Sequence, residues 1–481
     1  MSGSDSNLDD QYGYDFSREE ELQLIRLVER ASGELLPVTE DDSAVVVGRW
    51  QSSRSGRWSK GDDVDDVGYS DLRRALSELS GTSLPKAIQK DSSSSPLQRF
   101  RSFPRKPLSV SDLTSGSWCE LQYWYTLTRL PHGRRTQTPA MKQGTAVHQT
   151  LEEEVHVRVK VDASSKEDRF ALRLWNVVQG LRTLRETGLT RELEVWGLVD
   201  GEVVNGVIDG VGVENPDLAF EEELCEGVGG DGGDGGGDGV GVSKRIPAKK
   251  AALTDYFPPS KHGSKGRIYL TDVKTRGTTS PVSTAQLRSA KIQLLLYHRF
   301  LSAMASDALD FSVVAARYDL DVHAVLSDAF LAQMAGLHRD IFYDAHSRPT
   351  SPDQPPTDRV PYRTLHEICS LVRAELRQSF PLGSASMGPL LRVQYVHRSD
   401  GRALDAHVFP FSARALDDYL AGYMAWWRGE RPARGVKVDE AFKCRSCEFV
   451  HDCEWRVRLD GARVEGAKRR LRVKGGILEV L

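Results

Sequence analysis

Two β-rich runs joined by the dipeptide Asp200-Gly201 place the strongest constraint on the fold of this chain. Leu193 to Val199 and Glu202 to Val213 are extended in pattern, and an Asp-Gly pair between such runs favours a two-residue hairpin turn. A third strand is predicted over Arg267 to Thr275, which is apolar before Asp272. The sequence therefore predicts a β-sheet built around a central hairpin.

Helical segments flank these strands. Met141 to Lys160 is predicted to be a helix, because Val147, Leu151 and Val155 recur every four residues. Thr284 to Ala305 is predicted as a second helix behind a Ser/Thr cap. The core order becomes α-β-β-β-α-β, which indicates an α/β fold. The remaining predicted segments are a sixth-position strand over Phe311 to Leu320, a hairpin over Leu391 to Phe411 and a helix over Ala413 to Arg428.

Low-complexity stretches border this core. Residues 1–98 are rich in Ser, Asp and Gly and are predicted to be mostly disordered. Between Glu226 and Gly241, ten of sixteen residues are Gly, so residues 221–265 are predicted to form a disordered insert. Residues 99–460 then form the ordered domain, and 461–481 form a basic tail.

Charge and hydropathy exclude several classes of protein. The net charge of −4 excludes a generally basic surface, although a local basic channel remains compatible with it. The chain lacks an apolar run of the ~18 residues that a membrane span needs, so no membrane association is expected. Residues 1–24 carry seven acidic residues and one basic residue, unlike an Arg-rich mitochondrial presequence. A nuclear monomer is expected, with the mitochondrion as the alternative compartment.

Two predicted strands carry a set of residues suited to metal-assisted hydrolysis. Asp272 and Lys274 are two apart in one strand, so their side chains leave the same face of the sheet, and Asp209 joins them if its strand is the neighbour. Two carboxylates can hold Mg²⁺ (or Mn²⁺), which activates water and stabilises charge on a phosphate. The alternative is an ordinary solvated strand face.

The two predicted helices add polar pairs with helical spacing. His148 and Glu152 are four apart, as are Gln293 and Tyr297, so each pair shares a helix face. The alternative for His148 is a purely structural role, and for Gln293 and Tyr297 a hydrogen-bonded pair on a half-buried helix.

Four blocks in this order carry a family resemblance. Gly144-x-x-x-His148, Gly206-Val-Ile-Asp209, Asp272-Val-Lys-Thr275 and Gln293-x-x-x-Tyr297 together resemble the RecB-type branch of the PD-(D/E)xK nucleases. The resemblance implies a restriction-endonuclease-like core that hydrolyses phosphodiester bonds. It also implies metal ligands at His148, Asp209 and Asp272, and catalytic roles for Asp209, Asp272, Lys274, Gln293 and Tyr297.

Cysteines form a second group. Cys444, Cys447 and Cys453 lie within ten residues, and Cys119, Cys225 and Cys369 are the candidates for a fourth ligand. Four thiolates can hold a [4Fe–4S] cluster or zinc, and His451 permits a rival Cys₃His zinc site. The wide gap between one cysteine and a trio favours the cluster over a zinc finger.

The cysteine layout is similar to that of the eukaryotic, fungal-type exonuclease V family, single-strand DNA exonucleases with one cluster cysteine before the nuclease core and three after it. The resemblance covers about residues 99–460. It implies a [4Fe–4S] cluster on Cys119, Cys444, Cys447 and Cys453, which clips the two ends of the core together.

Residues 99–142 combine eight Lys or Arg with four aromatic residues between 118 and 125, a mixture suited to single-stranded DNA. Arg129, Arg134 and Arg135 are the predicted phosphate contacts. In the insert, Leu253, Tyr256 and Phe257 within residues 250–257 resemble the PIP box that binds the sliding clamp PCNA. The alternative is that these three side chains dock on the protein's own surface.

These observations favour a metal-dependent single-stranded DNA exonuclease acting in DNA repair. One competing hypothesis is a non-catalytic DNA-binding scaffold on a decayed nuclease fold, which the intact set of Asp209, Asp272 and Lys274 disfavours. The other is a zinc-binding nucleic-acid protein, which leaves the four nuclease motifs unexplained.

Overall fold

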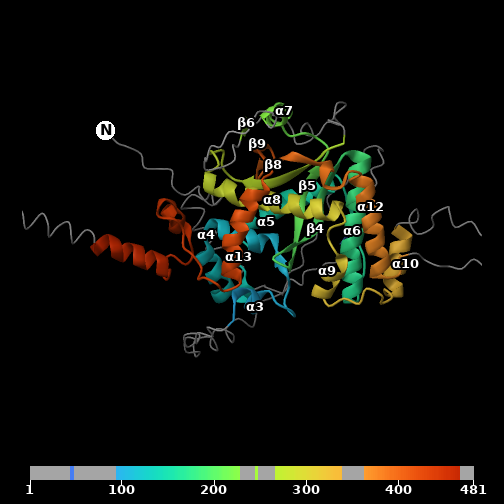
Figure 1. Cartoon of the computed structure of the whole chain (residues 1–481), viewed down its shortest axis with the longest axis horizontal. Coiled ribbons are helices and arrows are strands. Elements are labelled where there is room, and N and C mark those ends of the chain that lie inside the picture. Colours follow the sequence, from blue (N-terminus) through green and yellow to red (C-terminus); the bar gives the residue numbers. More distant parts are fainter. Residues whose placement is uncertain (1–43, 48–93, 228–243, 248–265, 338–361, 466–481) are drawn as a thin grey trace, which may run out of the picture.

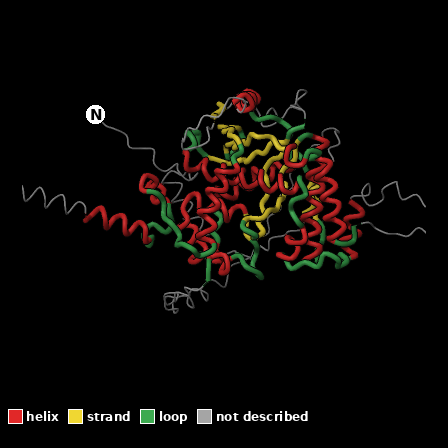
Figure 2. The backbone as a smooth tube through the Cα atoms, viewed as in Figure 1, coloured by secondary structure: helices red, strands yellow, loops and turns green. Residues whose placement is uncertain are grey.

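The computed structural model describes residues 44–47, 94–227, 244–247, 266–337 and 362–465. It has a mixed α/β architecture, in which a central sheet is flanked by helices (Figure 1, Figure 2). The sheet has seven strands in the order β2-β5-β7-β8-β9-β6, with β4 paired to β5. Its strands are β2 (Leu108–Ser109), β4 (Leu189–Val199), β5 (Glu202–Gly212), β6 (Lys244–Pro247), β7 (Ile268–Arg276), β8 (Met387–His397) and β9 (Ala403–Pro410).

Helices pack on both sides of the sheet. In Figure 1, α6 and α12 lie side by side at one end of the molecule, α8 crosses the sheet, and α4 and α13 lie at the other end. The longer helices are α4 (Val110–Arg129), α5 (Pro139–Glu153), α6 (Lys166–Thr187), α7 (Leu218–Gly227), α8 (Thr284–Ala305), α10 (Asp328–Leu337), α12 (Leu365–Ser379) and α13 (Ala413–Trp427). Shorter helical segments are α3 (Pro96–Phe100), α9 (Phe311–Arg317) and the 3₁₀ helix η5 (Val438–Ser446), and residues 454–465 are also helical.

The predicted hairpin is present and sets the register of the sheet. Val199 pairs with Glu202, and both turn residues, Asp200 and Gly201, have positive φ, as a two-residue type I′ turn requires. The two strands pair from Leu189 with Gly212 to Val199 with Glu202, with a gap in the paired residues only between Arg191 and Leu193.

Two strands share the other edge of β5. β2 pairs with it at Val204 and Asn205, whereas β7 pairs with it only at residues 210–212. β7 therefore leaves β5 immediately next to Asp209, which opens a fork in the sheet at that carboxylate.

α8 lies directly against the sheet because two glycines leave room for it. A Cβ on Gly197 would lie 2.0 Å from the Phe300 ring, and one on Gly206 would lie 2.6 Å from the Tyr297 ring. Both distances are far below van der Waals contact, so only glycine allows this approach. Ser283 and Gln286 form a capping box at the start of α8, as the predicted Ser/Thr cap requires.

Three predicted segments differ from the structure. Phe311 to Leu320 is not a strand: Phe311–Arg317 is α9, which the Asp310 side chain caps and which buries Phe311, Val314 and Ala315 with helical spacing. The next strand of the central sheet after α8 is β8.

The predicted helix over Met141 to Lys160 is too long. α5 ends at Glu153. The following residues form β3 (Val157–Lys160), which pairs with β1 (Ala44–Val47) in a small second sheet. β1 falls in the region 1–98, whose remaining residues before 94 lie outside the described part.

The prediction of disorder over residues 221–265 is wrong for the two parts of that range that the structure describes, residues 221–227 and 244–247. Residues 221–227 belong to α7, and β6 pairs with the sheet edge at β9. The rest of the insert, including Leu253, Tyr256 and Phe257, lies outside the described residues. No helix in the described ranges is long and apolar enough to cross a membrane.

Candidate active site and cysteine cluster

The fork between β5 and β7 brings the predicted carboxylates together. Gly210 pairs with Thr271, so Asp209 and Asp272 follow on the same face at the point where the strands separate. One carboxylate oxygen of Asp209 bridges the fork by accepting a hydrogen bond from the backbone N–H of Val273 at 2.8 Å. The two strands are therefore neighbours in the sheet, as the sequence predicts.

Lys274 links the strand to α8. Its Nζ donates to Asp272 Oδ1 at 2.7 Å and to Gln293 Oε1 at 3.1 Å. The Gln293 side chain in turn donates to the Tyr297 hydroxyl at 3.0 Å. Sequence reasoning placed these residues on one strand and one helix, and the structure joins them in a single hydrogen-bonded row.

Glu192 also belongs to this site, although the motifs did not include it. The pairs on either side, Arg191 with Gly210 and Leu193 with Ile208, place Glu192 opposite Asp209 on the hairpin. Ligand atoms of His148, Glu192 and Asp209 all lie within 4.8 Å of one another. Counting back from the Asp200-Gly201 turn identifies the same partner, so the hairpin prediction already contained the signal.

The backbone at Glu192 is unusual. Its φ of 50° lies in the left-handed region, which costs energy for a residue with a Cβ and is concentrated at functional sites. Like charges directly opposite on neighbouring strands also destabilise a sheet. A cation between Glu192 and Asp209 would relieve this repulsion, so the pair fits a metal ion.

Asp272 supplies the most direct sign of an ion. It is fully buried, and its Oδ2 has no hydrogen-bond partner. Burial raises the pKa of Asp272 to about 7; the Lys274 ammonium opposes this shift and Asp209 adds to it. A buried carboxylate oxygen without a donor is expensive unless a cation or proton occupies the position.

His148 reaches the same site from α5. Its Nδ1 lies 3.5 Å from Glu192 Oε1, and the hydrogen bond to Glu192 raises the pKa of His148 against the opposing effect of burial. Glu152, predicted to share the helix face of His148, instead pairs with Arg158 at 2.6 Å. The structure therefore brings His148, but not Glu152, to the fork.

The four cysteines predicted as one ligand set line a single cavity. Cys119 comes from a kink in α4, where its φ of −165° and ψ of 112° interrupt the helix. Cys444 lies in η5, and Cys447 and Cys453 follow it. All four are free thiols, and Gln122 and Trp455 are among the other residues that line the cavity.

This donor set fits a group that binds thiolates. Burial raises the pKa of Cys119 to about 12, and the neighbouring Cys447 and Cys453 add to the shift. Crowded buried thiols are poor anions by themselves, and a bound metal or cluster removes the penalty by supplying positive charge. His451 is exposed and is not part of the cavity lining, which disfavours the Cys₃His alternative.

The predicted DNA-contacting arginines lie close to the cysteine cavity. Arg129 is exposed and stacks on the Tyr125 ring, with its guanidinium carbon 3.7 Å from the ring centroid. Arg135 pairs with Glu448 at 2.9 Å, next to Cys447. Arg134 is exposed on the same loop.

Comparison with known proteins shows which proteins this chain is similar to. Residues 95–456 match the sequence model of a family described as "Exonuclease V - a 5' deoxyribonuclease". Exonuclease V of Danio rerio is 25% identical over 368 residues, covering 76% of this chain and 74% of that protein. A protein named "Exonuclease V, mitochondrial" from Candida albicans strain SC5314 is 21% identical, covering 72% and 70% respectively.

These matches define the class of protein as a DNA exonuclease, a hydrolase of phosphodiester bonds. More specifically, the chain belongs to the exonuclease V family. The description of the family names no metal, no cluster and no preference for single strands. We infer those properties from the site itself.

Proposed function

We propose that this chain is a metal-dependent exonuclease that degrades single-stranded DNA during DNA repair. The observation that carries the proposal is the partnerless, buried Oδ2 of Asp272, which follows the last β5–β7 pair as Asp209 does, together with the grouped ligand atoms of His148, Glu192 and Asp209. Such an oxygen-rich set suits Mg²⁺ or Mn²⁺. Glu192 thus extends the predicted ligand set of His148, Asp209 and Asp272.

The proposed core is restriction-endonuclease-like, with the order α-β-β-β-α-β. β4, β5 and β7 followed by α8 supply its middle, and β8 replaces the wrongly predicted strand as the last member. β8 supports this topology by pairing in parallel with β7 across the catalytic aspartate, at Asp272 and Val393.

The protein's residues divide the work of phosphodiester hydrolysis. The metal, when bound, supplies Lewis-acid stabilisation of the phosphate and lowers the pKa of bound water. Lys274 is held by Asp272 and Gln293, so its ammonium stays close to the place where a hydroxide nucleophile and phosphate charge develop. Tyr297 keeps Gln293 oriented through the hydrogen bond between their side chains.

The cysteine cavity is proposed to hold a [4Fe–4S] cluster on Cys119, Cys444, Cys447 and Cys453. Support comes from the convergence of four free thiols from opposite ends of the domain. The same two segments are also joined by the Arg431–Glu120 ion pair at 2.6 Å. The cluster would act as a structural clip, without redox chemistry.

The decisive assay uses end-labelled single-stranded DNA with Mg²⁺ or EDTA. Cleavage with Mg²⁺ but not EDTA is expected, and duplex and RNA substrates test strand preference. Asp272→Asn should abolish cleavage while DNA binding persists, whereas the exposed Asp418→Asn serves as a control. Cleavage that continues in EDTA after exhaustive metal removal would contradict the proposed mechanism.

The compartment and partners need separate tests. Fungal relatives are named mitochondrial, which favours the mitochondrion, whereas the comparisons give the expected nuclear location no support. Fractionation of cells expressing the tagged chain distinguishes the two. We also retain a monomer and clamp binding through residues 250–257 as proposals; light scattering and calorimetry with a peptide of residues 244–260 test them.

A further inference from the structure

Gln122 touches the cysteine sulfurs at both ends of the clip. Its backbone N–H donates to Cys119 Sγ at 3.4 Å, and its side-chain Nε2 donates to Cys447 Sγ at 3.5 Å. The side chain is buried and lines the cavity. Gln122 therefore donates one hydrogen bond to Cys119 and a second one to Cys447.

Lys443 brings a positive charge to the same place. It is only 1% exposed, and it directly precedes Cys444 in the chain. Its Nζ donates to the backbone oxygen of Trp118 at 3.2 Å, and Trp118 directly precedes Cys119. The ammonium also lies 4.4 Å from the centroid of the Trp118 ring, so it is held against the residue that precedes Cys119, although Lys443 does not itself line the cavity.

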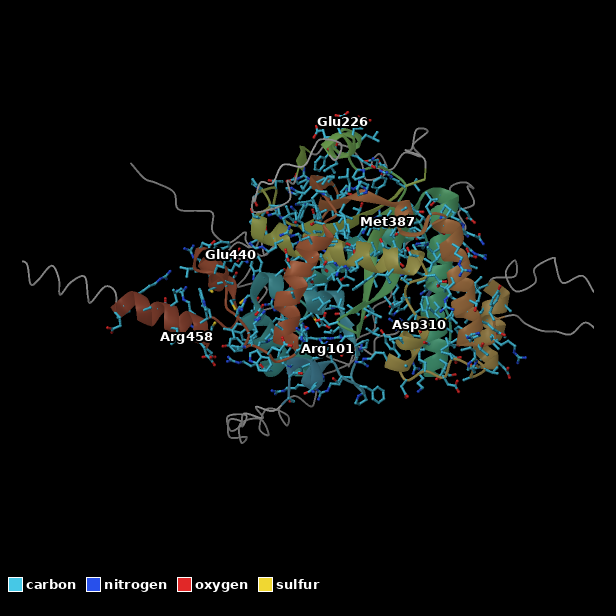
Figure 3. All side chains as sticks on the ribbon, viewed as in Figure 1. Arg101, Glu226, Asp310, Met387, Glu440 and Arg458 are labelled. Atoms are coloured by element: carbon cyan, nitrogen blue, oxygen red, sulfur yellow. The ribbon has the colours of Figure 1, made fainter. Side chains whose placement is uncertain are left out.

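The charge of Lys443 is only partly cancelled by its acidic neighbour. Glu440 accepts from Lys443 at 2.8 Å but also from Arg288 of α8 at 2.6 Å, so one carboxylate serves two cations. Figure 3 labels Glu440, which lies in η5, and Arg458, which lies in the helical residues 454–465. Burial lowers the pKa of Lys443, while Glu440 and Cys119 act in the opposite direction.

We propose that Gln122 and Lys443 stabilise the thiolate ligands of the cluster, Gln122 as a hydrogen-bond donor to Cys447 and Lys443 as a counter-charge near Cys119. This inference rests on the proposed cluster. Four thiolates outweigh the positive charge of a [4Fe–4S] core, so the assembly is an anion. Donors and cations around the sulfurs raise its reduction potential and retard ligand loss.

The test compares the cluster in variants of the full-length protein purified without oxygen. Gln122→Leu removes the donor, Gln122→Glu keeps the shape but adds negative charge, and Lys443→Met removes the cation. We expect iron to be lost to a chelator about tenfold faster in Gln122→Leu and Lys443→Met, the lower end of the range for losing a group that supports a metal ligand. The reduction potential should fall from wild type to Gln122→Leu and further to Gln122→Glu.

Conservative variants separate electrostatics from packing. Lys443→Arg keeps the charge and should restore a near wild-type potential, which a purely structural role would not explain. If Gln122→Leu fails to fold, Gln122→Glu and Lys443→Met still decide the question. Iron retention and potentials equal to wild type in these variants would overturn this inference alone. Zinc in place of iron in the wild-type protein would overturn the cluster assignment as well.

Discussion

At the scale of single residues, the active site depends on carboxylates that repel one another in the absence of a cation. Glu192 lies opposite Asp209, and Asp272 has a buried oxygen without a partner. Each feature costs stability in the free chain, and each becomes favourable when a divalent ion binds. The proposed metal ion would therefore offset both of these costs to the stability of the folded chain.

Glu192→Gln is expected to weaken metal binding. The amide keeps the size of the side chain but removes one of the charges that face the ion, so the Mg²⁺ concentration for half-maximal cleavage should rise about 10- to 100-fold. Titration of activity with Mg²⁺ measures the change. Glu153→Gln, an exposed carboxylate on α5, is the control, and an unchanged Mg²⁺ requirement in Glu192→Gln would exclude Glu192 as a ligand.

The metal-free protein should become less stable as the pH rises toward 7. The ordinary pKa of 3.8 for Asp272 is raised to about 7 by burial, so between these values the folded chain holds a proton that the unfolded chain has lost. The slope of unfolding free energy against pH is then negative. Thermal melts in EDTA below and above pH 7 measure it.

Asp272→Asn provides the matching test of that pH dependence. The neutral amide removes the titration, so the melting temperature should lose this fall and exceed the wild-type value above pH 7. Mg²⁺ should stabilise the wild type most above pH 7, because the cation needs the ionised carboxylate. A wild-type slope that persists in Asp272→Asn would assign it to another group.

At the scale of elements, the sequence predicted the hairpin, β7 and α8 well, because each has a strong local signal. Asp200-Gly201 defines a turn, and Ser283 with Gln286 defines a cap. The α9 segment was misread because Val313 and Val314 favour a strand locally, whereas Asp310 and burial of one face decide for a helix. The cap and the i, i+3, i+4 spacing of the buried residues Phe311, Val314 and Ala315 are local helix signals that outweigh the two β-branched residues.

The residues of the candidate site can be predicted only as far as the pairing register of the strands that carry them can be predicted. The motif residues Asp209, Asp272 and Lys274 were identified from their strands alone. Glu192 required counting along the hairpin, and its left-handed φ could not be anticipated from a non-glycine residue. The Gln122 contacts connect segments that are 325 residues apart, so only the folded chain reveals them.

Gly197→Ala should destabilise the contact between α8 and the sheet. The added Cβ would lie 2.0 Å from the Phe300 ring, so α8 must shift, at a cost on the order of 1–3 kcal/mol for an overpacked core. Urea unfolding measures the loss. Gly336→Ala, where an added Cβ meets nothing within 4 Å on α10, should instead be neutral or slightly stabilising. Equal stability of the two variants would contradict the tight approach of α8.

At the scale of the whole molecule, the cysteine cavity joins the beginning and end of the nuclease domain. Cys119 on α4 precedes all the catalytic residues, and Cys444, Cys447 and Cys453 follow them. A cluster on these ligands closes a very long loop and restricts the unfolded chain, an effect that grows with the logarithm of loop length. The candidate active site lies within that loop, so the proposed clip would stabilise it together with the rest of the domain.

Cys447→Ala should therefore lose iron and stability together. The loss of one of the four proposed thiolates should weaken binding of the cluster, and the loss of the long-range link should lower the unfolding free energy by roughly 3 kcal/mol or more, as for a cross-link across a long loop. Iron analysis and urea unfolding of the anaerobically purified variant measure both effects. Cys369→Ala is the matched control, because Cys369 is buried in α12 and is absent from the cavity lining. It should keep its iron and lose only the stability that a small core cavity costs. If Cys447→Ala kept both a full complement of iron and the wild-type unfolding free energy, Cys447 would not be part of the clip and the proposal would be wrong.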